Sequence, residues 1–192
     1  MKTALLASYE KDAALLRLGK MLAEAKWSLL GSAGTAKYLN ENGIACQDVA
    51  SIVGAPMLGH RVVTLSRELH AGLLAATPED FAELERLNIP RIDLVYVTLY
   101  PLEKTVADPA ATAQDVIEKT DIGGPTLLRS AAKGRRLVLS DPAQIDTLET
   151  WLKGGEDKNE EYKLATKFAA AAERRVADYV STSASYWEKQ LM

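Results

Sequence analysis

Short apolar runs and longer amphipathic stretches follow one another along the chain. The apolar runs have the length of buried strands, and the run at 92–99, IDLVYVTL, is the most apolar and the richest in β-forming residues. We therefore expect it to form a central strand. The strands predicted in this way cover residues 3–8, 27–30, 44–49, 92–99 and 136–140.

The stretches between these strands carry apolar residues three and four positions apart, which is the spacing of a helix face. Thr77 before Pro78, and Asp141 before Pro142, are typical helix starts. The predicted helices cover residues 12–25, 36–42, 77–87, 112–119, 125–133 and 142–153, whereas 71–76 is ambiguous. A long last helix follows, and one of its faces carries Leu164, Phe168, Ala172, Val176 and Tyr179.

Strands that alternate with helices are typical of a parallel sheet covered by helices on both faces. We expect a three-layer α/β fold in a single domain, with a core over 1–153 and a C-terminal helical extension over 156–192. Ligands of such sheets bind at the carboxyl ends of the strands. This rule selects four segments that we expect to share one pocket: residues 8–11, 32–36, 99–100 and 119–133.

Residues 119–133, with the sequence KTDIGGPTLLRSAAK, combine an acid, a glycine pair and two cations. Asp121 stands before Gly123 and Gly124, and Pro125 suits the first position of a helix. Free N–H groups at a helix start favour an anion or an oxyanion. An ordinary loop that caps a helix would use the same residues.

Composition and charge narrow the class of protein. The 192 residues carry a net charge of −3, and no basic run with interleaved aromatics is present, so neither nucleic acid nor a membrane surface is an expected partner. Cys46 is the single cysteine, which excludes an intrachain disulfide and fits a reducing compartment. No apolar run is long enough for a signal peptide or a membrane span. We expect a cytoplasmic protein.

Several other residues would suit either a ligand or the ordinary fold. Residues 32–36, SAGTA, lie where a strand turns into a helix and offer hydroxyl and N–H groups to a phosphate, although they match neither a Walker loop nor GxGxxG. Lys11 and Arg61 could bind an anion, or they could be ordinary surface charges. Tyr100, at the end of the predicted central strand, is either a half-buried aromatic or a proton donor.

Four segments also occur in the order and spacing of a known family. They read SAGTAKYL, MLGHRVVTL with HAGLLA, TLYPLEKTVADP, and TDIGGPTLLRSAAK, and they cover most of residues 1–150. They resemble the IMP cyclohydrolase (inosinicase) domain of the bifunctional enzyme that completes IMP, a domain of the methylglyoxal-synthase-like fold group. The last two segments are the specific signals.

The resemblance implies an activity and a set of site residues. The family closes FAICAR, the 5-formamidoimidazole-4-carboxamide ribotide, to IMP with loss of water, and backbone donors near the glycine pair would stabilise the oxyanion. Tyr100, Asp121 and Lys133 match catalytic residues, with Asp121 taking the amide proton and the other two donating protons or stabilising charge. The matching phosphate and nucleotide contacts are Lys11, Ser32, Gly34, Thr35, Ala36, Arg61, Thr64, Ile122, Gly123 and Gly124.

The chain departs from the family pattern at several positions. Val63 stands where the family has an active-site lysine, and Thr98 replaces an asparagine. Loss of a charged catalytic group lowers a rate by about 10²–10⁴-fold, although an intramolecular closure gains much from positioning alone. His60 or Arg67 could replace the missing cation.

Three functions therefore stay open at the level of sequence. The first is IMP cyclohydrolase. The second is a catalytically impaired homologue that binds a purine nucleotide or phosphate and senses it, which the Val63 departure favours. The third, methylglyoxal synthase or a related lyase, is disfavoured by the TDIGGPTLLRSAAK segment.

The resemblance also bears on cofactors and partners. It implies no metal and no organic cofactor, and His60 and His70 belong to no metal-binding motif.

The sequence ends before the family's transformylase domain, so we expect a separate protein to supply FAICAR. A helix over 125–133 would be about 12 Å long, so Lys133 reaches the centre near Asp121 only by extending back or from a second subunit. We expect a homodimer with sites near the interface.

Overall fold

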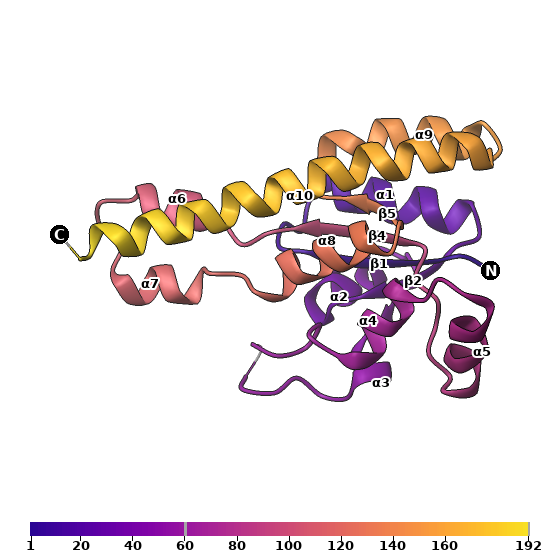
Figure 1. Cartoon of the computed structure of the whole chain (residues 1–192), viewed down its shortest axis with the longest axis horizontal. Helices are drawn as coiled ribbons and strands as arrows, with labels where there is room; N and C mark the ends of the chain where they lie inside the picture. The colour runs from indigo at the N-terminus through magenta and orange to yellow at the C-terminus, as the bar shows by residue number, and fades with distance from the viewer. Residues whose placement is uncertain (60, 192) are drawn as a thin grey trace.

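The computed structural model describes residues 1–59 and 61–191, and a parallel sheet forms its middle layer (Figure 1). The strand order is β3-β2-β1-β4-β5, and every neighbouring pair is parallel. The predicted strand at 92–99 is present as the shorter β4, which lies inside the sheet between β1 and β5, whereas the middle strand is β1. The strands are β1 (Thr3–Ser8), β2 (Ser28–Gly31), β3 (Gln47–Asp48), β4 (Leu94–Thr98) and β5 (Leu137–Leu139).

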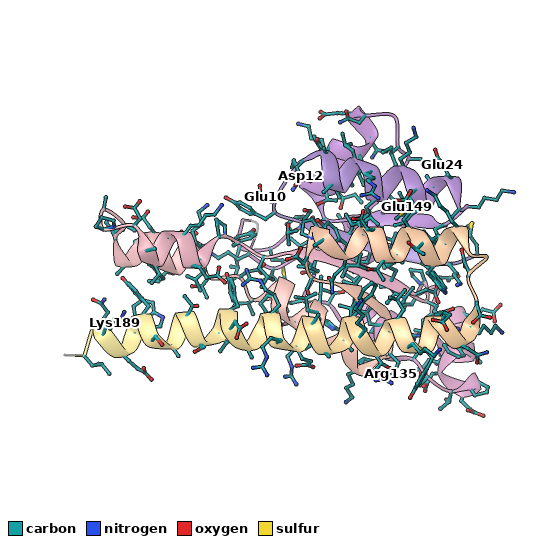
Figure 2. All side chains as sticks on the ribbon, turned by 90° about the horizontal axis from the view of Figure 1, so that it is seen from above. Glu10, Asp12, Glu24, Arg135, Glu149 and Lys189 are labelled. Carbon is teal, nitrogen blue, oxygen red and sulfur yellow. The ribbon has the colours of Figure 1, made fainter. Side chains whose placement is uncertain are left out.

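Helices cover both faces of this sheet. Figure 2 shows α1, between Asp12 and Glu24, on one side, and α10, which ends at Lys189, on the other. Burial on both faces explains why β1, β4 and β5 are nearly uninterrupted apolar runs. The helices are α1 (Ala13–Glu24), α2 (Ala33–Glu41), α3 (Ala50–Val53), α4 (Arg67–Leu74), α5 (Pro78–Arg86), α6 (Leu102–Ala107), α7 (Ala113–Glu118), α8 (Gly123–Lys133), α9 (Ile145–Lys153) and α10 (Lys158–Lys189).

Capping residues start the predicted helices where the sequence indicated. Thr77 and Asp80 form a reciprocal capping box at α5, and Asp141 caps a short 3-10 turn, Pro142–Gln144, that leads into α9. The ambiguous segment at 71–76 lies mostly in α4. The short helices α3 and α6 were not predicted. They have four and six residues, too few for a clear periodic pattern, and neither starts with a capping side chain as the six-residue α7 does at Thr112.

The predicted strand at 44–49 is shorter than expected. Only Gln47–Asp48 pairs with β2. The Asn40 side chain accepts a hydrogen bond from the Cys46 N–H at 3.0 Å and donates one to the Cys46 carbonyl at 2.8 Å. It therefore occupies the backbone groups that a longer strand would use for its ladder.

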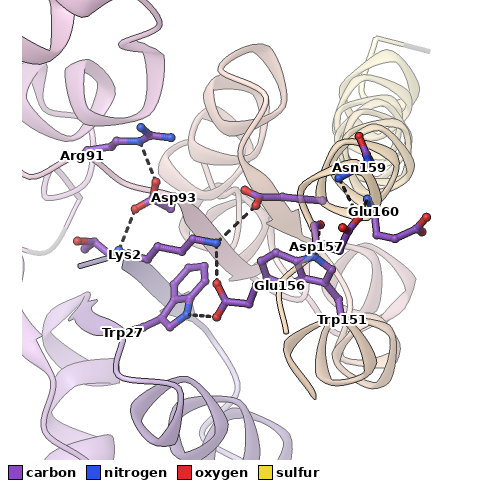
Figure 3. Close-up of polar contacts among 11 residues, drawn as sticks. Lys2, Trp27, Arg91, Asp93, Trp151, Glu156, Asp157, Asn159 and Glu160 are labelled. Carbon is purple, nitrogen blue, oxygen red and sulfur yellow. Dashed lines mark hydrogen bonds and ion pairs between the residues drawn. The ribbon is translucent and has the colours of Figure 1, made fainter. Parts of the chain in front are cut away.

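A cluster around Lys2 joins the amino end of the sheet to the start of α10 (Figure 3). The Lys2 ammonium lies 5.1 Å from the ring centroid of Trp27 and 4.7 Å from that of Trp151. It also pairs with Glu156 at 2.7 Å and with Glu161 at 3.5 Å. These contacts link β1 with the segment between α9 and α10, at the end of the sheet opposite the carboxyl ends of the strands.

The last helix, α10, has 32 residues and is about 48 Å long. Its predicted apolar face is buried in the main core, where Phe168, Ala172 and Tyr179 are at most 1% exposed. The C-terminal part of α10 projects beyond the sheet beside α6 (Figure 1). Among the described residues, no helix combines the length and the apolar composition needed to cross a membrane.

Candidate active site

A cavity of about 740 Å³ opens at the carboxyl ends of β1, β2 and β4. Each of the four segments selected by the strand-end rule contributes to its lining, for example Lys11, Ser32, Tyr100 and Asp121. The prediction that these segments share one pocket is confirmed. They meet because parallel strands all present their carboxyl ends at the same edge of the sheet.

One end of the pocket brings the start of α2 close to the Lys11 side chain. Ser32 precedes α2, so the N–H groups of the first turn, around Gly34, are directed toward the pocket. The Lys11 stem passes 3.5 Å from the point where a Gly34 side chain would begin, and its ammonium donates to the Ser8 and Tyr9 carbonyls. Burial lowers the pKa of Lys11, although the charge of Glu10 opposes this shift.

Two predicted ligand contacts, Thr35 and Ala36, do not line the pocket. Thr35 is 0% exposed, and its hydroxyl accepts hydrogen bonds from the Ser8 N–H at 3.1 Å and from the Ser32 hydroxyl at 3.0 Å. Ala36 is 2% exposed. As α2 turns inward, these residues come to lie behind the wall, where Thr35 holds the end of β1 in place.

Asp121 is held by backbone donors rather than standing free before them. Its Oδ1 accepts the Gly124 N–H at 2.9 Å, and the N–H groups of Tyr100 and Gly123 also face the carboxylate. Burial nevertheless raises the pKa of Asp121 above its ordinary value, because desolvation outweighs these donors. A side chain at Gly124 would collide with the carboxylate and would lie 2.7 Å from Leu99.

This arrangement corrects the expected start of α8. The helix begins at Gly123, not at Pro125, so both glycines lie in its first turn. The Asp121 carboxylate caps that turn. The N–H row that the sequence indicated as open to an oxyanion is therefore turned toward the carboxylate in this structure.

Tyr100 stands beside Asp121 at the end of β4. Burial, and after it the charge of Asp121, raises the pKa of the Tyr100 phenol. Its ring packs against Tyr9 with centroids 5.1 Å apart, and the Lys119 ammonium lies 5.4 Å from the Tyr9 ring centroid. The phenol therefore stays protonated and able to donate well above neutral pH.

The loop before α4 forms the opposite rim. Arg61 and Thr64 line the pocket, as does Val63, which also packs against the core. Arg61 pairs with Glu118 of α7 at 2.9 Å and so joins this loop to the far side of the opening. Ile122 also lines the pocket and is 60% exposed.

Among the described residues, neither Arg67 nor Lys119 lines the pocket in place of the lysine expected at position 63. Arg67 heads α4, pairs with Glu68 at 3.2 Å and does not line the pocket. The other suggested cation, His60, lies outside the described residues. Lys119 does not line the pocket either, and its ammonium lies 3.3 Å from the hydroxyl of Tyr9, which does.

Lys133 is the one predicted catalytic residue that this chain does not bring to the pocket. It lies exposed in the last turn of α8, whereas Asp121 lies just before the first turn. Ten residues separate it from Gly123, which corresponds to about 15 Å along the helix.

Tyr179 of α10 reaches the loop that carries Asp121, although the sequence indicated only a core residue there. Its hydroxyl accepts the Asp121 N–H at 2.9 Å and donates to the Lys119 carbonyl at 2.9 Å. Tyr179 is 1% exposed, so this bridge is shielded from water. Sequence reasoning also missed Ile117, Glu118 and Trp187 of the lining.

Metal ligands do not gather around this pocket. Across residues 1–59 and 61–191, no group of three or more His, Cys, Asp or Glu side chains is placed to hold a metal ion. Cys46 is buried, and burial raises the pKa of its thiol to about 12, so the thiol is unreactive at neutral pH.

Comparison with known proteins assigns the fold. Residues 14–126 match the model of the MGS-like domain, which is more than half of the chain. This chain belongs to the MGS-like domain family. The predicted methylglyoxal-synthase-like α/β architecture is thereby confirmed.

Relatives of this MGS-like domain carry the resemblance seen in its motifs. It is 40% identical to the "Bifunctional purine biosynthesis protein PurH" of Ligilactobacillus salivarius over 197 residues, and 39% identical to that of Thermosynechococcus vestitus over 193 residues. These matches cover 99% and 98% of this chain. The chain spans only 38% and 37% of the relatives' own lengths.

A solved structure matches over nearly its whole length. The crystal structure of ForH superposes on this MGS-like domain with a TM-score of 0.82 at 30% sequence identity. The match covers 97% of this chain and 98% of ForH. The long C-terminal helix is therefore part of the shared architecture.

Proposed function

We propose that this protein is an IMP cyclohydrolase, which closes FAICAR to IMP with loss of water. One observation carries the proposal: Lys11, Ser32, Tyr100, Asp121 and Gly124 line one pocket in a chain 36–40% identical to PurH proteins over its length. Those relatives are named as purine biosynthesis proteins, which supports a purine ribonucleotide as substrate.

The pocket suits the ring closure as follows. The 5′-phosphate binds at Lys11 and the start of α2, with Arg61 at the rim. Asp121 accepts a proton from the carboxamide nitrogen as that nitrogen attacks the formyl carbon. Tyr100 donates a proton to the formyl oxygen, and the C–O bond then breaks to release water. The second proton of that water comes from Asp121, which took it from the carboxamide nitrogen, and the formamido nitrogen returns its proton to Tyr100. The new C–N bond and the C=N bond complete the six-membered ring.

The backbone geometry divides the roles within this site. Because the glycine N–H groups hold the Asp121 carboxylate, we assign them to orienting the base. The Tyr100 phenol then becomes the donor for the developing oxyanion. The directions of the two pKa shifts suit these roles, since Asp121 becomes a stronger base than an ordinary aspartate and Tyr100 remains protonated.

Ultraviolet detection of FAICAR conversion to IMP by the purified protein tests the proposal directly. We expect measurable turnover in wild type, and dihydroxyacetone phosphate, offered as an alternative substrate, should not react. Absence of FAICAR turnover in a protein that still binds IMP would support the sensing function instead. The observation that favours this second candidate is Val63, which faces the pocket without a charge.

Val63→Lys separates the two candidates further. Restoring the charge should raise the rate of ring closure by roughly tenfold or more, since charged catalytic groups contribute about 10²–10⁴-fold. Val62→Lys is the matched control, because the neighbouring side chain does not line the pocket. A Val63→Lys protein with an unchanged rate would count against a cyclohydrolase mechanism here.

The proposal extends to assembly and location. We propose a homodimer in which Lys133 of one copy faces the pocket of the other, since Lys133 is exposed and outside the pocket of its own chain. We also propose a cytoplasmic location, which the free thiol of Cys46 supports.

A further inference from the structure

An exposed tryptophan from the last helix forms part of the pocket wall. Trp187 lies two residues before the end of α10 and lines the pocket together with Ile117 and Glu118 of α7. It is 39% exposed, although tryptophan side chains usually bury most of their area. Neither the strand-end rule nor the family motifs point to this residue.

The path of α10 explains how Trp187 reaches the opening. Tyr179 fixes the helix against the segment of Lys119 and Asp121 through two hydrogen bonds. Trp187 follows eight residues later, about 12 Å farther along the axis. This part of α10 has passed the edge of the sheet and lies beside α6 (Figure 1).

The Trp187 indole contacts a second aromatic ring of α10. Tyr186 packs edge-on against it, with ring centroids 4.9 Å apart and planes at 79°. Tyr186 is itself partly buried against the main core. Ile117 and Ile122, which line the same pocket, are 49% and 60% exposed. Trp187, Ile117 and Ile122 therefore give the pocket an apolar surface next to the Arg61–Glu118 ion pair, in addition to its polar part at Lys11 and the start of α2.

We propose that Trp187 stacks on the heterocycle of the bound ribonucleotide and so determines base affinity. The inference rests on the proposed function and adds to it the residue that contacts the base by stacking. A nucleotide whose phosphate binds at Lys11 and α2 extends its base across the pocket, past Asp121 and Tyr100. A planar, uncharged heterocycle there covers the exposed indole, and such base–aromatic stacking is independent of hydrogen-bond pattern.

Tryptophan emission provides a direct readout, because the chain has three tryptophans in two separate places. Trp27 and Trp151 flank Lys2 at the opposite end of the sheet (Figure 3). Titration with IMP should change the emission of wild type, and the change should be absent from Trp187→Phe. Calorimetry on the same samples measures binding independently of the signal.

Affinity measurements test whether the Trp187 indole contributes to binding of the base. Trp187→Leu should raise the Kd for IMP about tenfold, and Trp187→Phe, which keeps an aromatic face, about two- to threefold. The Kd for ribose 5-phosphate, which lacks a base, should stay within about twofold in both. Tyr162→Leu is the matched control, since Tyr162 is an exposed aromatic of the same helix outside the pocket.

Each outcome distinguishes this inference from the proposed function. Wild type that fails to bind IMP by calorimetry contradicts the proposed function, and this inference with it. IMP binding with silent emission, or an emission change that survives in Trp187→Phe, contradicts the inference alone. Equal losses of affinity for IMP and ribose 5-phosphate in Trp187→Leu would assign the indole to packing.

Discussion

At the scale of single residues, Asp121 shows how the site departs from ordinary surface chemistry. Three backbone N–H groups face its carboxylate, and yet burial raises its pKa. A raised pKa in the folded state means that the ionised form is less stable there than in the unfolded chain. The negative charge of Asp121, which the proposed ring closure would use, therefore reduces the folding stability at pH values above this pKa.

Asp121→Asn should separate the effect of the Asp121 charge on the rate from its effect on folding stability. The amide oxygen can still accept the Gly124 N–H, but it cannot take a proton, so the rate of ring closure should fall by about 10²–10⁴-fold. Removal of the buried charge should raise the melting temperature at neutral pH, by about 2–4 °C for each kcal/mol recovered. Calorimetric melting at pH 7 and the ultraviolet assay check both; a lower melting temperature would contradict the assigned burial.

The pH dependence of the proposed ring closure follows from the burial of Asp121, Lys11 and Tyr100. The acid limb of kcat/KM should lie above the ordinary aspartate pKa of 3.8, because Asp121 must be ionised to act as base and its pKa is raised. The basic limb should reflect loss of the Lys11 charge below the ordinary value of 10.5, since burial lowers that pKa, while Tyr100 stays protonated longer. Asp121→Asn should lose the acid limb, and Lys11→Ala should lose the basic one.

At the scale of elements, α10 connects the end of the chain to the segment that carries Asp121. The Tyr179 hydroxyl bridges the Asp121 N–H and the Lys119 carbonyl, and the Tyr179 ring lies 5.7 Å from the guanidinium carbon of Arg175. Arg175 in turn pairs with Glu103 of α6. The helix α10 therefore holds the loop of Asp121, the proposed base, and contacts the short helix α6 that follows β4.

Tyr179→Phe tests this positioning. Loss of the hydroxyl leaves two buried backbone groups unpaired, which costs about 1–3 kcal/mol and so lowers the melting temperature by several degrees. If the bridge positions the base, kcat should also fall more than KM changes, and the acid limb should shift. Tyr162→Phe, at an exposed position of the same helix, should change neither. A lower melting temperature with an unchanged pH profile would indicate a purely structural bridge.

The sequence predicted those helices and strands correctly whose bounds depend on residues close together in the chain. The run at 3–8 became β1 without change, and the capping box at Thr77 started α5 as expected. It failed where a side chain redirected the backbone. Asn40 shortened β3, and the Asp121 carboxylate drew the two glycines into α8.

At the scale of the whole molecule, the ends of the chain are held at opposite sides of the sheet. Lys2 ties β1 to the segment before α10, and α10 then runs past the sheet to the pocket. Lys133 lies at neither place, because it is exposed at the C-terminal end of α8. A contribution from Lys133 to catalysis therefore requires a second copy of the chain.

Mixed dimers test that requirement. Lys133→Ala and Asp121→Asn should each be nearly inactive alone, whereas a mixture refolded or co-expressed together should recover up to about a quarter of wild-type activity. In a two-fold dimer, half of the assemblies are mixed and each of these has one intact site. Light scattering checks that dimers form. No recovery in confirmed mixed dimers would exclude a shared site.

The sequence by itself determined the alternation of strands and helices, the carboxyl-edge segments and the family motifs, because these depend on local spacing and on strand direction. It correctly brought Lys11, Ser32, Tyr100 and Asp121 to one pocket. Only the tertiary structure decided what each group faces. Thr35 turned behind the wall, and Trp187 entered the pocket, because burial and helix packing depend on residues far apart in the chain.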